Sequence, residues 1–315
     1  MSHRLPVKEF EKQYKDHLSQ YHTWDQKAHA DQWILFENNI GEKLSIDEVA
    51  VTNGELYTLL TNKAAKGGKG ALTAVVAGTK AIDVTAVLAK IPEPSRQAVK
   101  EVTLDMSNAM NAIIRSSFPN AAIVTDRFHV QQLISEAVQE IRITHRREAL
   151  ADETAAILCA RKEKRVYQPA LYENGDTKKQ LLARSHYVLF KLKSKWTARQ
   201  QARATILFRE FPKLHHAYNL SMMFRAWYEN KTSKEDAREK LKLWVRKVAE
   251  ENIESFIVAA ESVKAHEETI LNYFNHRSTN ASAESFNAKL KGFRALVRGV
   301  RDVKFFPFRV GKLYG

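Results

Sequence analysis

The spacing of apolar residues divides the chain into regions with different predicted structure. Over residues 5–40 the apolar positions form a partial helical stripe, and the WILF run at 33–36 extends it, so the pattern predicts helix. Short runs rich in β-branched residues then alternate with turns as far as residue 126. From Phe128 to about Phe274 the periodicity is helical throughout, and a last helix is predicted over roughly 280–298.

The middle region predicts five strands and two helices. The strand-like runs are LSIDEVAV (44–51), LYTLLTNK (56–63), ALTAVVAG (71–78), VKEVTLD (99–105) and AAIVTD (121–126). The first three are closely spaced and predict an antiparallel meander, whereas helices at 81–91 and 107–118 predict crossover connections to the other two. The fold class is therefore an α/β mixed sheet interrupted by a large all-helical insertion.

These patterns give four predicted parts of the chain. An N-terminal helical segment covers residues 1–42, and the first part of the sheet core covers 43–130. The helical insertion covers 131–275, and residues 276–315 form the final core helix and a basic C-terminal tail. The loop KAAKGGKGA lacks the spacing of a nucleotide-binding phosphate loop, so we expect it to be a β-turn.

Composition narrows the class of protein. The chain has 315 residues and 44% apolar content, which supports a packed core. No apolar run approaches the ~18 residues that span a bilayer, and the charged N-terminus does not resemble a signal peptide. Cys159 is the single cysteine, which excludes an internal disulfide and a cysteine-based zinc site, so we expect a cytoplasmic protein without a membrane partner.

The charge is strongly positive and is concentrated near the C-terminus. The formal net charge is +14, which indicates a polyanionic partner such as nucleic acid. Residues 285–315 hold eight Lys and Arg residues against one acid, Asp302. The final helix would carry Glu284, Asn287, Lys291, Arg294 and Arg298 on one face, and Phe286, Leu290, Phe293 and Val297 on the other.

Two aspartates follow or interrupt predicted strands, and one glutamate begins the last helix. If the sheet is of the ribonuclease-H type, its first and fourth strands are neighbours, and Asp47 and Asp105 lie roughly 5 Å apart. Carboxylates this close repel unless a cation lies between them, and hard divalent cations prefer oxygen ligands. Glu284 would supply the third carboxylate of a two-metal site.

Each of these residues also has an ordinary structural interpretation. Asp47 could be a solvated residue at a strand end, and Asp105 could be the N-cap of the following helix. Glu284 could be a first-turn glutamate that interacts with the helix dipole, and the basic tail could be a solvated face. The two-metal hypothesis rests on all the features occurring together in one order.

Three stretches of the sequence resemble DDE transposases of bacterial insertion sequences, specifically the ISL-three-like group. They are LSIDEVAVTNGELYTLL, EVTLDMSNAMNAIIRSSFPNAAIVTDRFHVQQLI and NHRSTNASAESFNAKLKGFRALVRGVRDVKFFPFRV. The resemblance extends from about residue 40 to the C-terminus and is less clear through the helical middle. It implies a ribonuclease-H-like catalytic core and metal-dependent DNA cleavage and strand transfer, with two Mg²⁺ or Mn²⁺ ions in each active site.

The resemblance also assigns roles to individual residues. Asp47, Asp105 and Glu284 match the three acidic metal ligands. Asp126 and His129 match a D-x-x-H signature and are given a supporting role, as is Asn287, although Asp126 is a rival second ligand. Apart from the resemblance, the continuation of the Glu284 face and the concentration of positive charge there predict DNA contacts by Lys291, Arg294, Arg298 and Arg301.

The resemblance leaves the DNA-recognition apparatus and the reaction outcome open. Longer relatives begin with a cysteine-containing zinc segment and a helix-turn-helix, and this sequence has neither. Either a separately encoded protein recognises the element ends, or the chain is a truncated copy. The expected partner is double-stranded DNA, bound by a homo-oligomer associated with the nucleoid. A nuclease without strand transfer and a non-catalytic DNA-binding relic are the alternative functions.

Overall fold

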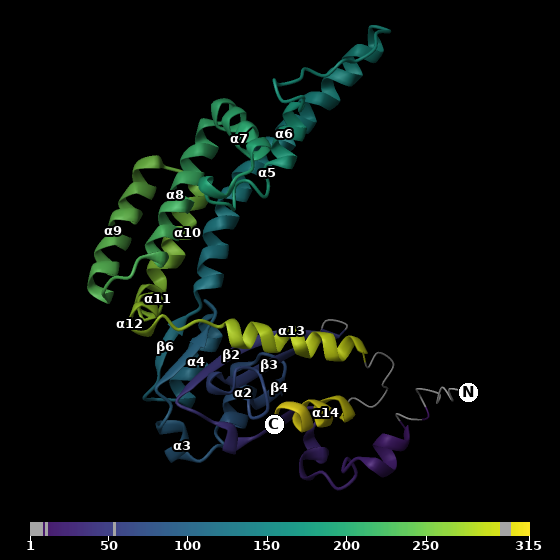
Figure 1. Ribbon diagram of the computed structural model, residues 1–315, viewed down its shortest axis with the longest axis vertical. Coiled ribbons are helices and arrows are strands. Elements are labelled where there is room, and N and C mark those ends of the chain that lie inside the picture. Colours follow the sequence, from purple (N-terminus) through teal and green to yellow (C-terminus); the bar gives the residue numbers. More distant parts are fainter. Residues whose placement is uncertain (1–8, 10–11, 53–54, 297–303) are drawn as a thin grey trace. The chain divides into compact units, whose positions relative to one another are not determined.

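The chain folds into two compact units in the computed structural model (Figure 1), which describes residues 9, 12–52, 55–296 and 304–315. The sheet unit comprises Met1–Asp126 and His276–Gly315, and the helical unit comprises Arg127–Asn275. The sheet unit is therefore formed by two segments that are distant in the sequence, with the whole helical unit inserted between them.

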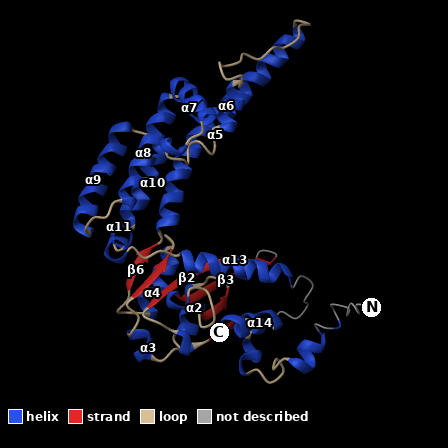
Figure 2. Ribbon diagram, viewed as in Figure 1, coloured by secondary structure: helices blue, strands red, loops and turns tan. Residues whose placement is uncertain are grey.

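A six-stranded mixed sheet forms the centre of the sheet unit (Figure 2). Its spatial order is β1-β4-β3-β2-β5-β6. The strands are β1 (Trp33–Leu35), β2 (Lys43–Thr52), β3 (Glu55–Asn62), β4 (Leu72–Ala77), β5 (Glu101–Leu104) and β6 (Ala122–Thr125). The pairs β2–β3 and β3–β4 are antiparallel, whereas β2–β5 and β5–β6 are parallel. The meander, the two crossover strands and the contact between the first and fourth predicted strands are confirmed.

The prediction of helix throughout residues 5–40 is wrong at 33–35, which form β1. This strand pairs antiparallel with β4, with Trp33 opposite Val76, and it adds a sixth strand to the five that were predicted. Ile34 is buried while both neighbours are half-buried. The short apolar run fits an edge strand because the sheet supplies hydrogen bonds to its backbone, which local periodicity cannot reveal.

The rest of the N-terminal segment contains only short helices. They are η1 (Tyr14–Leu18), η2 (Asp25–His29) and η3 (Glu37–Asn39). Tyr21 from this segment packs with Phe305 and Phe308 of a C-terminal helix, α14 (Phe305–Tyr314). The segment predicted as a basic tail therefore includes a helix that packs on the N-terminal segment.

Helices cover both faces of the sheet, and alternate residues of β2 face the two layers. On one face, Leu44 and Ile46 pack in a core cluster with residues of α2 (Ala81–Leu88) and α4 (Asn108–Ser117). On the other face, Val49 packs with Phe286 and Leu290 of α13 (Ala281–Leu296). A short helix, α3 (Glu93–Gln97), precedes β5. The three predicted helices are thus present as α2, α4 and α13; the last part of the 280–298 prediction, including Val297, lies outside the described residues.

The helical unit contains no strand, and all of its residues are described. Its long first helix is α5 (Arg127–Lys162). The others are α6 (Lys178–Arg184), η5 (Lys193–Lys195), α7 (Ala198–Glu210), α8 (Pro212–Glu229), α9 (Lys234–Glu251), α10 (Glu254–Ala265), α11 (Glu267–Leu271) and α12 (Tyr273–His276). An aromatic core that includes Phe224, Trp227 and Trp244 joins α8 and α9. The prediction of an all-helical middle region is confirmed.

The assignment of β1 to the core leads to a stability prediction. Ile34 is 1% exposed, so Ile34→Ala should lower the free energy of unfolding by roughly 2–5 kcal/mol. Leu18 lies in the same N-terminal segment but is 67% exposed. Leu18→Ala should therefore change the free energy of unfolding by less than about 0.5 kcal/mol. Denaturant unfolding of both variants measures the difference, and equal effects would contradict a core role for β1.

Candidate active site

The parallel pairing of β2 and β5 brings the two predicted aspartates to the same level of the sheet. Ser45 lies opposite Thr103 in this register. Asp47 and Asp105 each follow two residues later, and residues two apart along a strand face the same side. β5 ends at Leu104, so Asp105 directly follows the strand. Continued alternation predicts for Asp105 the α13 side of the sheet, which Asp47 shares with Val49.

Asp47 is held by the protein on both of its carboxylate oxygens. Its Oδ1 accepts a hydrogen bond from the backbone N–H of Glu48 at 2.8 Å, and its Oδ2 accepts one from Nδ2 of Asn287 at 2.6 Å. The Asn287 amide therefore joins α13 to β2 at the predicted metal ligand. Its other atom, Oδ1, is buried and has no hydrogen-bond partner among the described residues.

Asp105 orients the turn that leads into α4. Its Oδ1 accepts a hydrogen bond from the backbone N–H of Ser107 at 2.8 Å. The helix N-cap is Ser107, whose hydroxyl accepts from the N–H of Met110. The alternative interpretation of Asp105 as the N-cap is therefore wrong, because a hydroxyl two residues later has that function.

Glu48 is a third carboxylate in this region that the sequence analysis did not select. Burial raises its pKa, and the negative charges of Asp105 and Asp47 raise it further. Strand alternation assigns Glu48 to the opposite face of β2 from Asp47, which gave no reason to group them. However, β5 ends at Leu104 while β2 continues to Thr52. Glu48 therefore lies in the part of β2 that extends beyond the end of β5, close to where Asp105 follows. The only sequence signal for Glu48 was its position directly after Asp47 in the run SIDE.

Glu284 lies on a stripe of α13 whose neighbours contact β2. Asn280 and Asn287, four residues before it and three after it, reach Ser45 and Asp47 respectively. The backbone N–H of Glu284 donates to the carbonyl of Asn280 at 2.9 Å, and its side chain is exposed. This arrangement orients the stripe towards the aspartates. Within the part of the chain that the structure describes, no three His, Cys, Asp or Glu residues gather closely enough to hold a metal. Convergence of the three carboxylates stays a prediction.

The two residues of the D-x-x-H signature fall in different units. Asp126 is 2% exposed and follows β6, which lies beyond β5 and so one strand further from Asp47. Its charge acts on the ammonium of Lys63. His129 belongs to α5 in the helical unit, where its ring lies edge-on to Phe128. The supporting roles of both residues stay predictions.

The four predicted DNA contacts have different outcomes. Lys291 is exposed on α13. The Arg294 guanidinium is half-buried and stacks over the Phe306 ring, 5.0 Å from its centroid. Arg298 and Arg301 lie outside the described residues. On the other flank of α13, Nζ of Lys289 donates to the carbonyl of Gly67, which ties the Gly/Lys loop to this helix.

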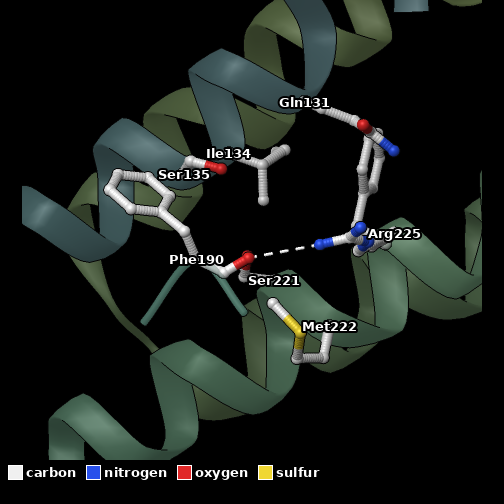
Figure 3. A pocket seen from close by; sticks show the side chains of 8 residues that line it. Gln131, Ile134, Ser135, Phe190, Ser221, Met222 and Arg225 are labelled. Carbon is white, nitrogen blue, oxygen red and sulfur yellow. Dashed lines mark hydrogen bonds between the residues drawn. The ribbon is translucent and has the colours of Figure 1, made fainter. Parts of the chain in front are cut away.

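A small cavity lies within the helical unit (Figure 3). It is lined by Gln131, Ile134, Ser135, Phe190, Ser221, Met222, Phe224 and Arg225. The Arg225 guanidinium donates to the Phe190 carbonyl at 3.2 Å and is paired with Glu229 at the same distance. Because that positive charge is already balanced, the cavity is better suited to water than to a phosphate group, and water could satisfy the buried Gln131 Nε2.

Comparison with known proteins identifies the family. A model of DDE transposases of the ISL3 group, described as "Transposase", matches residues 44–310. The chain belongs to this family. It is 21% identical over 271 residues to the transposase for insertion sequence element IS1001 of Bordetella parapertussis, which covers 85% of this chain and 60% of the relative. It is 24% identical over 206 residues to the transposase for IS1557 of Mycobacterium tuberculosis, covering 65% of this chain and 45% of the relative.

The chain thus spans about half the length of the curated relatives that it matches. No solved structure matches it. Among the described residues, none of the helices is both long and apolar enough to cross a membrane. Membership of the family implies use of a divalent metal ion.

The side chains around Asp47 are of the types that a divalent cation prefers, although the described residues do not form a cluster that holds one. The side chains of Asp47, Asp105 and Glu48 are hard oxygen donors. Burial raises the pKa of Glu48, and the negative charges of Asp105 and Asp47 raise it further. The buried Oδ1 of Asn287 adds an amide oxygen without a hydrogen-bond donor in the described structure. A cation would both reduce the repulsion and interact with this oxygen.

The raised pKa of Glu48 predicts a pH-dependent stability difference. A carboxyl group whose pKa is higher in the folded state destabilises the fold when ionised, above its folded pKa, and has no such effect below its unfolded value of 4.5. Glu48→Gln should therefore be more stable than the parent near pH 8 in chelator, and the difference should vanish as the pH falls through the folded pKa towards about pH 4. Urea unfolding at both pH values provides the measurement. A stability difference that is the same at both pH values would contradict the raised pKa of Glu48.

Proposed function

We propose that this chain is the catalytic part of a DNA transposase, which cleaves phosphodiester bonds and transfers DNA strands to move an insertion sequence. Family membership supports this activity. The observation that carries the proposal is the register of β2 and β5, in which Ser45 lies opposite Thr103. Continued by two residues, this register supports neighbouring positions for Asp47 and Asp105. Such an arrangement is suited to phosphoryl transfer, where catalysis depends mainly on positioning and on charge stabilisation.

The fold proposed for the sheet unit is ribonuclease-H-like. Three antiparallel strands followed by two parallel crossover strands support it, as does the return of the chain to this sheet through α13. On this proposal the catalytic core consists of residues 43–130 and 276–315, and residues 131–275 are an insertion. The segment 1–42 contributes β1 to the edge of the same sheet.

In the proposed site, Asp47, Asp105 and Glu284 would hold two Mg²⁺ or Mn²⁺ ions. Bound cations would activate an attacking oxygen and stabilise the negative charge of the leaving oxygen. Asn287 orients the Asp47 carboxylate through its 2.6 Å hydrogen bond. Lys291 lies two turns after Glu284 on the same helix face, where its ammonium can hold a DNA phosphate.

The proposed partners are double-stranded DNA at the element ends and at the target, and a second copy of this chain on that DNA. A separately encoded protein would recognise the ends. The reaction would take place on the chromosome in the cytoplasm. Asp126 and His129 would support the insertion or contact DNA, without holding the metal ions.

The first test separates the two candidate second ligands. Asp105→Asn should reduce metal-dependent nicking of element-end DNA by a factor of at least about 10³, because it removes a charged ligand while keeping the side-chain shape. Asp126→Asn is the matched control and should retain more activity. Gel assays of nicking and joining in Mg²⁺ or Mn²⁺, with binding measured in chelator, give the result.

The outcomes of this test distinguish the functional hypotheses. Nicking without joined products would identify a nuclease. Binding without nicking by the parent would identify a DNA-binding relic. An active Asp105→Asn variant beside an inactive Asp126→Asn variant would transfer the ligand role to Asp126.

The second test concerns the basic residues after Glu284. Each phosphate contact contributes a slope of about −0.9 to the dependence of log affinity on log salt concentration for duplex DNA. Replacing all four predicted contacts with Ala should flatten this slope by roughly three to four units on two unrelated duplexes. The four are Lys291, Arg294, Arg298 and Arg301.

A variant with the same loss of charge controls for the general effect of net charge. It replaces four exposed basic residues elsewhere in the sheet unit, namely Lys80, Lys90, Lys100 and Arg115. If both variants flatten the slope equally, the basic segment has no special contact with DNA.

A further inference from the structure

The sheet face beneath the start of α13 is unusually polar for a buried surface. Ser45 and Thr103 on the paired strands β2 and β5 are fully buried, and Asn280 is 1% exposed. Buried polar groups are costly unless they have hydrogen-bond partners, so such a layer permits few relative positions of its elements. The layer therefore fixes the helix more specifically than apolar packing alone.

Lys63 lies within this layer, at the end of β3. Its side chain is 12% exposed, and its Nζ donates to Oγ1 of Thr103 at 2.7 Å and to Oγ of Ser278. The ammonium also lies 3.6 Å from the buried carboxylate of Glu101. Burial lowers the pKa of Lys63, whereas Glu101 and Asp126 act in the opposite direction. The ammonium has exchanged water for partners on β5 and on the segment that precedes α13.

Side-chain contacts link Lys63 to Thr103, Thr103 to Ser45, and Ser45 to Asn280, while Lys63 also contacts Ser278. The backbone from Ser278 to Asn280 closes the circuit, and we name these five residues the Lys63 ring. The Ser45 hydroxyl lies within hydrogen-bond distance of the Asn280 side chain and is 3.3 Å from the Thr103 carbonyl. Lys63 and Ser45 thus hold Ser278 and Asn280, two residues apart, immediately before α13 begins. Two strands determine where this helix enters the sheet unit.

At β2, β5 and the start of α13, the Lys63 ring lies two to four residues before a proposed metal ligand. Asp47 follows Ser45 by two residues, and Asp105 follows Thr103 by two residues. Glu284 follows Asn280 by one helical turn, and its N–H donates to the Asn280 carbonyl. A shift of the α13 entry would therefore move Glu284 relative to both aspartates.

We propose that Lys63 is a positioning residue of the active site, which sets the place of Glu284 through Ser278. The catalytic role of Glu284 in this inference rests on the proposed function, whereas the fixing of α13 does not. The contact with Ser278 is the decisive one. The contacts with Thr103 and Glu101 would be sufficient for a lysine that only stabilises the sheet.

Substitution of Ser278 tests the proposal without disturbing the sheet. Ser278→Ala removes the Lys63 contact with the segment that precedes α13. The Lys63 hydrogen bond to Thr103 and its ion pair with Glu101 remain, so the fold should persist. Loss of a hydrogen bond to a charged group should accelerate hydrogen exchange at the Glu284 amide by about tenfold or more. Ser278→Thr restores the hydroxyl and should return the exchange rate to the parent value. Ser285→Ala, on the exposed side of α13, is the matched control and should have no effect.

Activity measurements on the same variants test the consequence for catalysis. In Ser278→Ala the nicking rate at saturating DNA should fall by about tenfold or more, with DNA affinity within about twofold of the parent and rescue by Ser278→Thr. Unchanged exchange in Ser278→Ala would overturn the proposal, whether or not the protein nicks DNA. Faster exchange with parental nicking would overturn the link to Glu284. Faster exchange in a chain whose parent has no nicking activity would support the positioning of α13 and reject the proposed function.

Discussion

The parallel pairing of β2 with β5 is the constraint on which the candidate site depends. It joins residues that lie about 58 positions apart in the chain, since Lys43 is opposite Glu101 and Ser45 is opposite Thr103. Because side chains alternate along a strand, a register shift of one residue would place one aspartate on the opposite face from the other. The register is supported on both sides: β3 and β4 of the antiparallel meander lie beside β2, and β6, which α4 connects to β5, lies beside β5.

The helix that covers this pair has two kinds of contact with the sheet. Phe286 and Leu290 bury apolar surface against β2, β3 and β4, which stabilises the helix but tolerates small movements. Asn280 and Asn287 instead form hydrogen bonds with particular residues of β2. The apolar contacts supply most of the stability, and the polar contacts determine the position. This division is consistent with a site whose chemistry depends on the placement of carboxylates.

Charge is distributed around the site in a way that suits a polyanionic substrate and a cation. Burial raises the pKa of Glu48, and the negative charges of the nearby Asp105 and Asp47 raise it further. Lys289 and Lys291 of α13 are exposed. Lys63, in contrast, is largely buried beside the segment that precedes this helix. Positive charge inside the sheet unit thus holds the structure, whereas exposed positive charge is available to DNA.

The sequence by itself determined the strand meander, the two crossover strands, the helical insertion and the family, because periodicity and motif spacing are local properties. It also selected Asp47 and Asp105 as neighbours, through the expected strand order. Tertiary structure alone decided that residues 33–35 form a strand, because their hydrogen-bond partners lie in β4. It likewise revealed Glu48 and Lys63, whose significance depends on charges and hydroxyl groups that are distant in the sequence. The partners of Lys63 meet only when the sheet and the segment before α13 have assembled, so no local pattern could have indicated that residue. For Glu48 the only local signal was its position beside Asp47.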